Sequence, residues 1–217
     1  MSNVLIIGAT GGVGSRLGPL LIQAGHQVTG IHRKPRQADA LREIGIKPVL
    51  GDLMEMTADD FSHVAKGHDV IVFSAGAAGS GLDRTSAIDG DGVSKTIAAA
   101  KKNSISRIYL VSACMDAGRD LPTSEGFEHY MKTKKQADNA LVASGLDWVI
   151  LRPGELISED GNGLVQANLA VPAGRVARGN VAAMLAALID QPVIRREIIE
   201  ITDGDVPIHR AVKSLLR

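Results

Sequence analysis

Short apolar runs alternate with longer amphipathic segments along this chain, and this alternation limits the folds that it can adopt. Strands are expected at residues 4–7, 27–31, 47–50, 70–73, 107–111, 148–151 and 197–201. Helices are expected between and after them, at about 12–24, 35–44, 57–65, 85–102, 127–143 and 181–189, with a last one from 207. This order is typical of βαβ units. It predicts an α/β fold with a doubly wound, mostly parallel sheet and helices on both faces.

The segment GATGGVG at 8–14 joins the first expected strand to the first expected helix. Its glycines follow a G-x-x-G-x-x-G spacing, which lets backbone N–H groups and the helix N-terminus approach a pyrophosphate. A purely structural tight turn would also need glycine. The strand before it, the helix after it and a second strand about 20 residues on favour a Rossmann-type dinucleotide site. The residues expected to bind the cofactor here are Gly8, Thr10, Gly11, Gly12, Val13 and Gly14.

The second expected strand ends in the basic sequence His32, Arg33 and Lys34. NAD-specific sites place an acidic residue about here for the ribose 2′-hydroxyl, whereas an arginine accommodates a 2′-phosphate. The nearest acid downstream is Asp39, in the next helix. Because the guanidinium of Arg33 is planar and permanently charged, it suits a phosphate. The pattern predicts NADP(H) rather than NAD(H); the alternative is a solvated basic loop.

Composition excludes several other classes of protein. The 24 basic and 24 acidic residues cancel, and aromatic residues make up only 3%, so neither a nucleic-acid surface nor an anionic-membrane surface is expected. The 217 residues fit one domain, with a small substrate-side region around 154–178. The single cysteine, Cys114, suits a reducing cytosol, and no histidine spacing predicts a metal site. We expect a cytoplasmic monomer or homodimer.

Several further motifs, spread over the whole chain, carry a family resemblance. They are HRKP at 32–35, GDL at 51–53, SAG at 74–76, DGDGV at 89–93, YLVSA at 109–113, YMKTK at 130–134 and LRPG at 151–154. With GATGGVG, they make the chain similar to the atypical short-chain dehydrogenase/reductases of the NmrA-like or epimerase-like type. The resemblance implies that Asp52 and Leu53 flank the adenine. It also implies that Ser74, Ala75 and Gly76 line the ribose and diphosphate, and that Pro153 and Gly154 lie by the nicotinamide.

Tyr130 and Lys134 are spaced i, i+4 on an expected helix, so their side chains share one face. In the resembled family such a pair is the proton donor and its activator, and Lys134 would also hold the ribose. A neighbouring ammonium is expected to lower the pKa of the phenol from near 10. Ser112 is expected to bond the substrate oxygen, although an alignment shifted by one would put Ala113 there. A packing pair is the alternative for Tyr130 and Lys134.

These features together predict an NADPH-dependent oxidoreductase that transfers hydride to a small carbonyl compound or a similar acceptor. Three alternatives remain open: a nucleotide-sugar epimerase or dehydratase, a non-catalytic NADP(H)-binding redox sensor of the NmrA-like type, and a flavin or tetrapyrrole reductase that needs only hydride delivery. The DGDGV stretch departs from the Asn-containing motif of larger epimerase-like members. The substrate is expected to be selected by residues 76–84, 115–127 and 155–178.

Overall fold

The computed structural model describes residues 1–118 and 122–216. Within these ranges nine strands form one sheet in the order β11-β8-β10-β6-β5-β4-β1-β2-β3. The neighbours from β3 to β10 run parallel, whereas β8 lies antiparallel to β10 and β11. The strands of the sheet are β1 (Asn3–Ile7), β2 (Gln27–His32), β3 (Lys47–Leu50), β4 (Val70–Phe73), β5 (Arg107–Val111), β6 (Asp147–Pro153), β8 (Leu164–Asn168), β10 (Glu197–Asp203) and β11 (Val206–Pro207).

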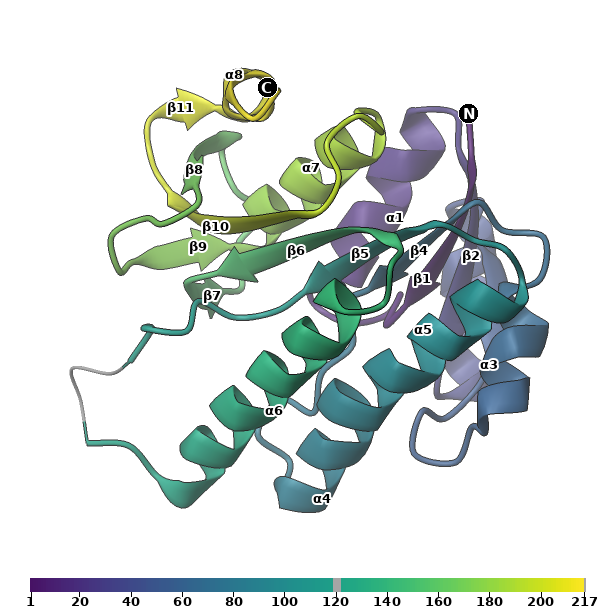
Figure 1. Ribbon diagram of the computed structural model, residues 1–217. Coiled ribbons are helices and arrows are strands. Elements are labelled where there is room, and N and C mark those ends of the chain that lie inside the picture. The colour runs from purple at the N-terminus through teal and green to yellow at the C-terminus, as the bar shows by residue number, and fades with distance from the viewer. Residues whose placement is uncertain (119–121, 217) are drawn as a thin grey trace.

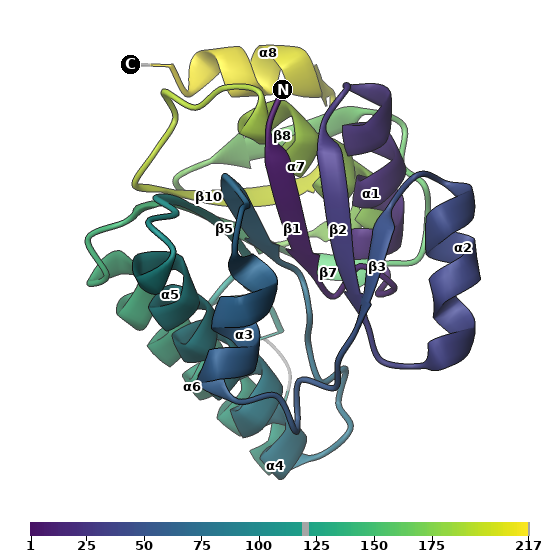
Figure 2. The same cartoon turned by 90° about the vertical axis from the view of Figure 1, so that its right-hand side faces the viewer.

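Helices cover both faces of this sheet (Figures 1 and 2). One face carries α3 (Ala58–Ala65), α5 (Gly92–Lys102) and α6 (Glu125–Val142), and the other carries α1 (Gly14–Gln23), α2 (Ala38–Glu43) and α7 (Arg178–Ile189). The central strands are therefore buried on both sides, which explains why β4 is an unbroken apolar run, VIVF, in which all residues are buried. The predicted doubly wound α/β fold is confirmed.

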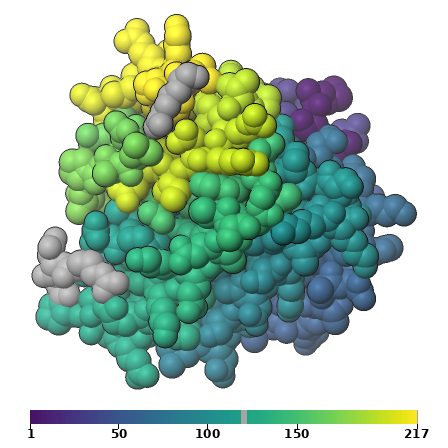
Figure 3. Space-filling view, viewed as in Figure 1, coloured from purple at the N-terminus to yellow at the C-terminus, as the bar shows by residue number. Residues whose placement is uncertain are grey.

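The segment after β6 folds back beside the parallel sheet. Two short strands in it, β7 (Glu155–Ile157) and β9 (Arg175–Ala177), pair with each other outside the main sheet. The helix α8 (Ile208–Ser214) then packs on α7 and β8. In the space-filling view these C-terminal residues, coloured yellow, form the top of the molecule (Figure 3).

Several element boundaries differ from those expected. The helix expected from residue 85 starts earlier, with α4 (Leu82–Arg84), and contains a π-helical stretch, η2 (Thr85–Asp91), before α5. The sixth strand, expected at 148–151, is longer, and Pro153 is the last residue of β6. Proline lacks only the N–H, and the Pro153 carbonyl still accepts a bond from the backbone N–H of Cys114 at 2.9 Å.

The helix starts are encoded locally. Thr57 caps α3, as expected, because its hydroxyl accepts from the N–H of Asp60 while the Asp60 carboxylate accepts from the N–H of Thr57. Ser124 caps α6 in the same position, with its hydroxyl accepting from the N–H of Phe127. Of the helices in the described ranges, none has both the length and the apolar character needed to cross a membrane.

Candidate active site

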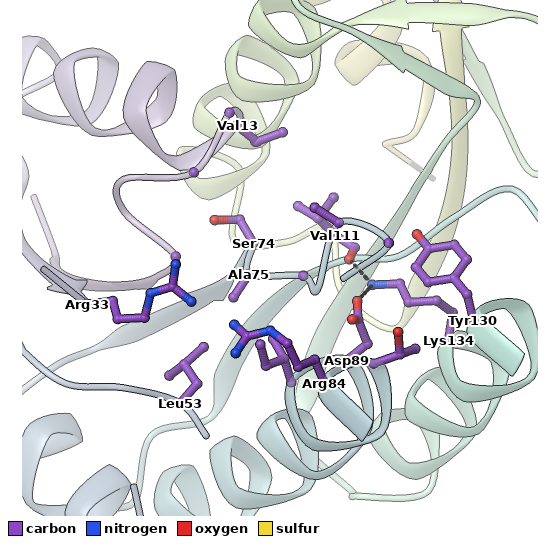
Figure 4. A pocket seen from close by; sticks show the side chains of 18 of the residues that line it. Val13, Arg33, Leu53, Ser74, Ala75, Arg84, Asp89, Val111, Tyr130 and Lys134 are labelled. Atoms are coloured by element: carbon purple, nitrogen blue, oxygen red, sulfur yellow. Dashed lines mark hydrogen bonds and ion pairs between the residues drawn. The ribbon is translucent and has the colours of Figure 1, made fainter. Parts of the chain in front are cut away.

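A cavity of about 890 Å³ opens at the carboxyl ends of the parallel strands, where the strand order reverses between β1 and β4. Open α/β sheets bind their ligands at this point. Residues that follow β1, β2, β3, β4 and β5 all line the cavity, and α6 closes one side of it (Figure 4). The sheet therefore brings together segments that lie far apart in the sequence.

The glycine-rich turn forms one wall. Gly8 has φ +95°, and a Cβ there would lie 2.6 Å from the backbone nitrogen of Ala75, so only glycine fits between β1 and the end of β4. The N–H of Gly11 donates to the carbonyl of Gly8 at 3.0 Å and closes the turn. A Cβ at Gly14 would overlap that same Gly8 carbonyl oxygen, so Gly14 lets α1 start directly against the turn.

The N–H groups of Gly12 and Val13 have no acceptor within the described parts of the chain, although both residues line the cavity. Unpaired backbone N–H groups at the start of a helix are the groups that hold phosphate oxygens. The turn thus offers free backbone N–H donors to a dinucleotide diphosphate, and its glycines have no side chains that would block the approach of the diphosphate.

The other end of this wall is basic. Arg33 and Lys34, just after β2, line the cavity, and Arg84 of α4 points into it across from Arg33 (Figure 4). None of the three forms an ion pair with a carboxylate of residues 1–118 or 122–216. Asp39 lies outside the cavity and pairs with Arg42 at 2.6 Å. The predicted position for an anionic group is therefore cationic and free of acidic partners.

Lys134 lies at the opposite end of the cavity and is almost fully buried. Its ammonium donates to the backbone carbonyl of Val111 at 2.8 Å and lies 3.5 Å from Oδ1 of Asp89 (Figure 4). The other carboxylate oxygen of Asp89 accepts from the N–H of Ala77 at 2.9 Å. The Asp89 side chain, in the π-helical stretch, is only 1% exposed, so Lys134 is charge-compensated inside the protein.

Asp138 lies on α6 one helical turn after Lys134. Its Oδ2 accepts from the guanidinium of Arg152 at 2.9 Å. Its Oδ1 and the hydroxyl of Ser112 are both buried without a partner of good hydrogen-bond geometry in the described ranges. Burial raises the pKa of Asp138, while the nearby Ser112 hydroxyl and Arg152 oppose the shift. Ser112 lines the cavity, with its hydroxyl buried beside the carboxylate of Asp138.

The expected effect of Lys134 on Tyr130 is wrong for the protein without bound ligand. Burial, followed by the charges of Asp89 and Asp138, raises the pKa of Tyr130 to about 12. Burial lowers the pKa of Lys134, with Asp89 and Asp138 acting in the opposite direction. Because burial disfavours the phenolate, and the two carboxylates act in the same direction, the phenol keeps its proton.

Most of the residues predicted for the site line this one cavity: Gly8, Thr10, Gly11, Gly12, Val13, Arg33, Lys34, Asp52, Leu53, Ser74, Ala75, Gly76, Ser112, Tyr130 and Lys134. Four others do not line it: Gly14, His32, Pro153 and Gly154. His32 is buried, and its Nδ1 lies 3.0 Å from the carbonyl oxygen of Lys34. It therefore contacts the backbone of the basic segment Arg33–Lys34 and does not line the cavity. The contact of each predicted residue with a cofactor stays a prediction.

Gly154 has a different reason to be glycine. A Cβ there would overlap the carbonyl oxygen of Gly174, which accepts from the N–H of Glu155 at 2.9 Å. Its own N–H donates to Ile201 at 3.0 Å. Gly154 therefore allows the close pairing of β7 with β9 and does not line the cavity.

Sequence reasoning did not assign site roles to Arg84, Asp89 and Arg178, which line the cavity. Asp89 begins the DGDGV stretch, which was noted only for its departure from a family motif. Arg84 falls in a loop expected to select the substrate. Arg178 likewise ends the segment 155–178 that was expected to select the substrate, but its place at the glycine-rich turn was not expected, because its side chain reaches that turn from α7 only in the folded chain. The expected substrate segment 115–127 contains residues 119–121, which lie outside the described residues.

Comparison with known proteins agrees with this geometry. The profile of the NAD(P)H-binding family matches residues 8–192. A protein of Bacillus subtilis named "Uncharacterized sugar epimerase YhfK" is 37% identical over 98% of this chain and 99% of its own length. The structure of a putative NAD-dependent epimerase/dehydratase from Bacillus halodurans is 34% identical, covers 99% of this chain and 100% of its own, and has a TM-score of 0.90. The anaerobillin reductase ChuY of Escherichia coli O157:H7 is 27% identical, with coverage of 94% and 98% and a TM-score of 0.78.

Proposed function

We propose that this chain, which belongs to the NAD(P)H-binding family, is an NADPH-dependent oxidoreductase that transfers hydride to a small carbonyl compound or a similar acceptor. One observation carries the proposal. Tyr130, Lys134 and Ser112 line the same cavity as the glycine-rich turn, at the end opposite Arg33. A dinucleotide that extends along the cavity from Arg33 would bring its nicotinamide to these three side chains.

The choice of NADPH rests on Arg33 and Lys34. A 2′-phosphate placed beside them would meet two cations that are free of acidic partners in the described chain. The free N–H groups of Gly12 and Val13 would hold the diphosphate. Asp52 and Leu53, which line the cavity, would flank the adenine, as the family resemblance implies.

The protonated state of Tyr130 fits reduction. When bound, NADPH would supply hydride to the carbonyl carbon, and the carbonyl oxygen needs one proton to form the alcohol. Tyr130 holds that proton at neutral pH, since its pKa is about 12, and would donate it to the oxygen as a general acid. Ser112, whose hydroxyl lacks a partner of good geometry within the described chain, would bond the same oxygen. Lys134 would hold the ribose or the phenol from its buried position.

The direct test is a screen of aldehydes, ketones, quinones and flavins as acceptors, in which the loss of NADPH absorbance measures the reaction. With the best acceptor, Tyr130→Phe should lower turnover about 10² to 10⁴-fold, the usual effect of a positioned general acid, and leave the Kd of NADPH nearly unchanged. Lys135→Ala, on the exposed side of the same helix, is the matched control and should act like the wild type.

Full activity in Tyr130→Phe would contradict the role of the phenol and favour an enzyme that needs hydride delivery alone, as for a flavin or tetrapyrrole acceptor. Tight NADPH binding with no acceptor turned over would favour a redox sensor. The names of two similar proteins, one a sugar epimerase and the other an epimerase/dehydratase, motivate a second candidate, a sugar epimerase. An epimerase would interconvert nucleotide sugars and leave the amounts of oxidised and reduced cofactor unchanged. Chromatography would detect the interconverted sugars.

A further inference from the structure

Arg178 brings a cation from the C-terminal part of the chain to the glycine-rich turn. It is the first residue of α7 and lines the cavity together with Gly12, Val13 and Leu156. A Cβ built on Gly12 would lie 2.5 Å from Cδ and 2.7 Å from Nε of Arg178. Gly12 does not have a positive φ. The absence of a side chain at Gly12 therefore leaves space that the arginine occupies.

The backbone around Arg178 is held on both sides. The N–H of Ala177 donates to both carboxylate oxygens of Asp203 at 3.1 Å, and the N–H of Gly179 donates to Glu159 at 3.0 Å. Asn180, only 2% exposed, bonds Asp203 at 2.7 Å through its amide. The arginine is therefore mounted on a fixed backbone, and its side chain is directed across the turn.

The guanidinium of Arg178 donates to the carbonyl of Leu156 at 3.2 Å and has no carboxylate partner in the described chain. Arg16, which also meets the turn, differs in this respect. Its guanidinium pairs with Asp160 at 3.0 Å and donates to the Gly12 carbonyl at 2.9 Å, outside the cavity. Of these two arginines at one turn, the one that faces the cavity is the one without a counter-charge.

We propose that Arg178 is a ligand of the dinucleotide diphosphate, so that α7 completes the phosphate site that the glycine-rich turn begins. The inference rests on the proposed cofactor site but not on its choice between the two dinucleotides, because NADH and NADPH carry the same diphosphate. A guanidinium beside the N–H groups of Gly12 and Val13 can form a charge-assisted hydrogen bond to the same oxygens. It would also link cofactor binding to the backbone of Leu156, on the substrate side of the cavity.

The test is fluorescence titration of NADPH and NADH into the wild type, Arg178→Met and Arg178→Lys. Methionine keeps an apolar stem over Gly12 and removes the charge. Arg178→Met should raise the Kd of both dinucleotides about 10 to 100-fold, as expected for one charged hydrogen bond. Arg178→Lys should recover part of this loss. Adenosine 2′-monophosphate, which lacks the diphosphate, should bind equally to all three proteins.

Arg175→Met is the matched control, since Arg175 is exposed, pairs with Glu155 at 3.5 Å and does not line the cavity. Equal Kd values for wild type and Arg178→Met would overturn the proposal. So would an equal loss in Arg178→Met and Arg178→Lys, which would indicate a structural role. Arg33→Ala separates this inference from the NADPH preference, because it should weaken NADPH and adenosine 2′-monophosphate while NADH changes little.

Discussion

At the scale of single residues, the glycines of the turn perform different tasks that their shared motif conceals. Gly8 and Gly14 make room for backbone atoms, whereas Gly12 makes room for the side chain of Arg178. The motif predicts a phosphate site, but it does not say which glycine faces the ligand and which faces the protein. That distinction depends on which atoms lie around each Cα in the folded chain.

The contrast predicts different costs for two equivalent substitutions. Gly14→Ala places a methyl group on the Gly8 carbonyl, where only the backbone could give way, and should lower the free energy of unfolding by about 1–3 kcal/mol. Gly12→Ala displaces a flexible arginine and should cost less than about 1 kcal/mol. Urea unfolding of both variants measures the difference. Equal losses of unfolding free energy in the two variants would contradict the different packing of Gly12 and Gly14.

Tyr130 makes stability depend on pH in the alkaline range. Its pKa is raised from 10.0 to about 12 in the folded protein, so the folded state holds the proton more tightly than the unfolded state. The stability contribution is fully present below pH 10 and is lost as the pH rises toward 12. Relative to Tyr130→Phe, the wild type should lose about 1.4 kcal/mol between neutral pH and pH 11. Tyr109, whose pKa is also raised by burial, is common to both proteins and cancels. A difference that does not change with pH would contradict the raised pKa.

At the scale of elements, the sequence predicted the central strands well, since β4 and β5 have the expected bounds. Continuous apolar runs between turns leave little choice for strands that are buried on both faces. The sequence did not predict the π-helical stretch that carries Asp89, because no local pattern distinguishes it from α-helix. Residues 155–178 were expected to be irregular or short-stranded, and the bounds of β7, β8 and β9 were not predicted, since their pairing depends on contacts with segments far along the chain.

In the candidate site, too, residues in local motifs were predictable from the sequence, whereas residues brought in by distant contacts were not. Gly8, Arg33, Tyr130 and Lys134 were predictable because each belongs to a motif next to a recognisable element. Arg178 was not, because only the packing of α7 against α1 brings it to the turn. The direction of the pKa shift at Tyr130 was also not predicted, since neither the burial of the phenol nor the nearby carboxylates of Asp89 and Asp138 can be read from the sequence motif.

The buried charged residues Lys134 and Asp138 of α6 and Asp89 of η2 give a prediction at this scale. Lys134→Met would leave Asp89 and Asp138 buried without the ammonium and should cost about 3–5 kcal/mol of unfolding free energy. The double variant Lys134→Met/Asp89→Asn removes the uncompensated charge and should recover part of that loss. Lys135→Met, exposed on the same helix, should change the unfolding free energy by less than about 0.5 kcal/mol. Denaturant unfolding checks all three, and a double variant less stable than the single one would refute the ion pair.

At the scale of the whole molecule, one cavity collects residues from both halves of the chain. The β1–β5 half supplies the glycine-rich turn and the basic end, α6 supplies Tyr130 and Lys134, and the segment after β6 adds Leu156 and Arg178. The proposed dinucleotide would lie along the carboxyl edge of the sheet, within this one cavity.

The most direct test of this account is the affinity of the purified protein for the two dinucleotides. Calorimetric titration should give a Kd for NADPH about 10 to 100-fold below that for NADH, because a 2′-phosphate beside Arg33 gains a charged hydrogen bond. Arg33→Ala should remove most of that difference, whereas Arg42→Ala, outside the cavity and paired with Asp39, should preserve it. Equal affinities, or tighter binding of NADH by the wild type, would contradict the assignment of this protein as an NADPH-dependent enzyme.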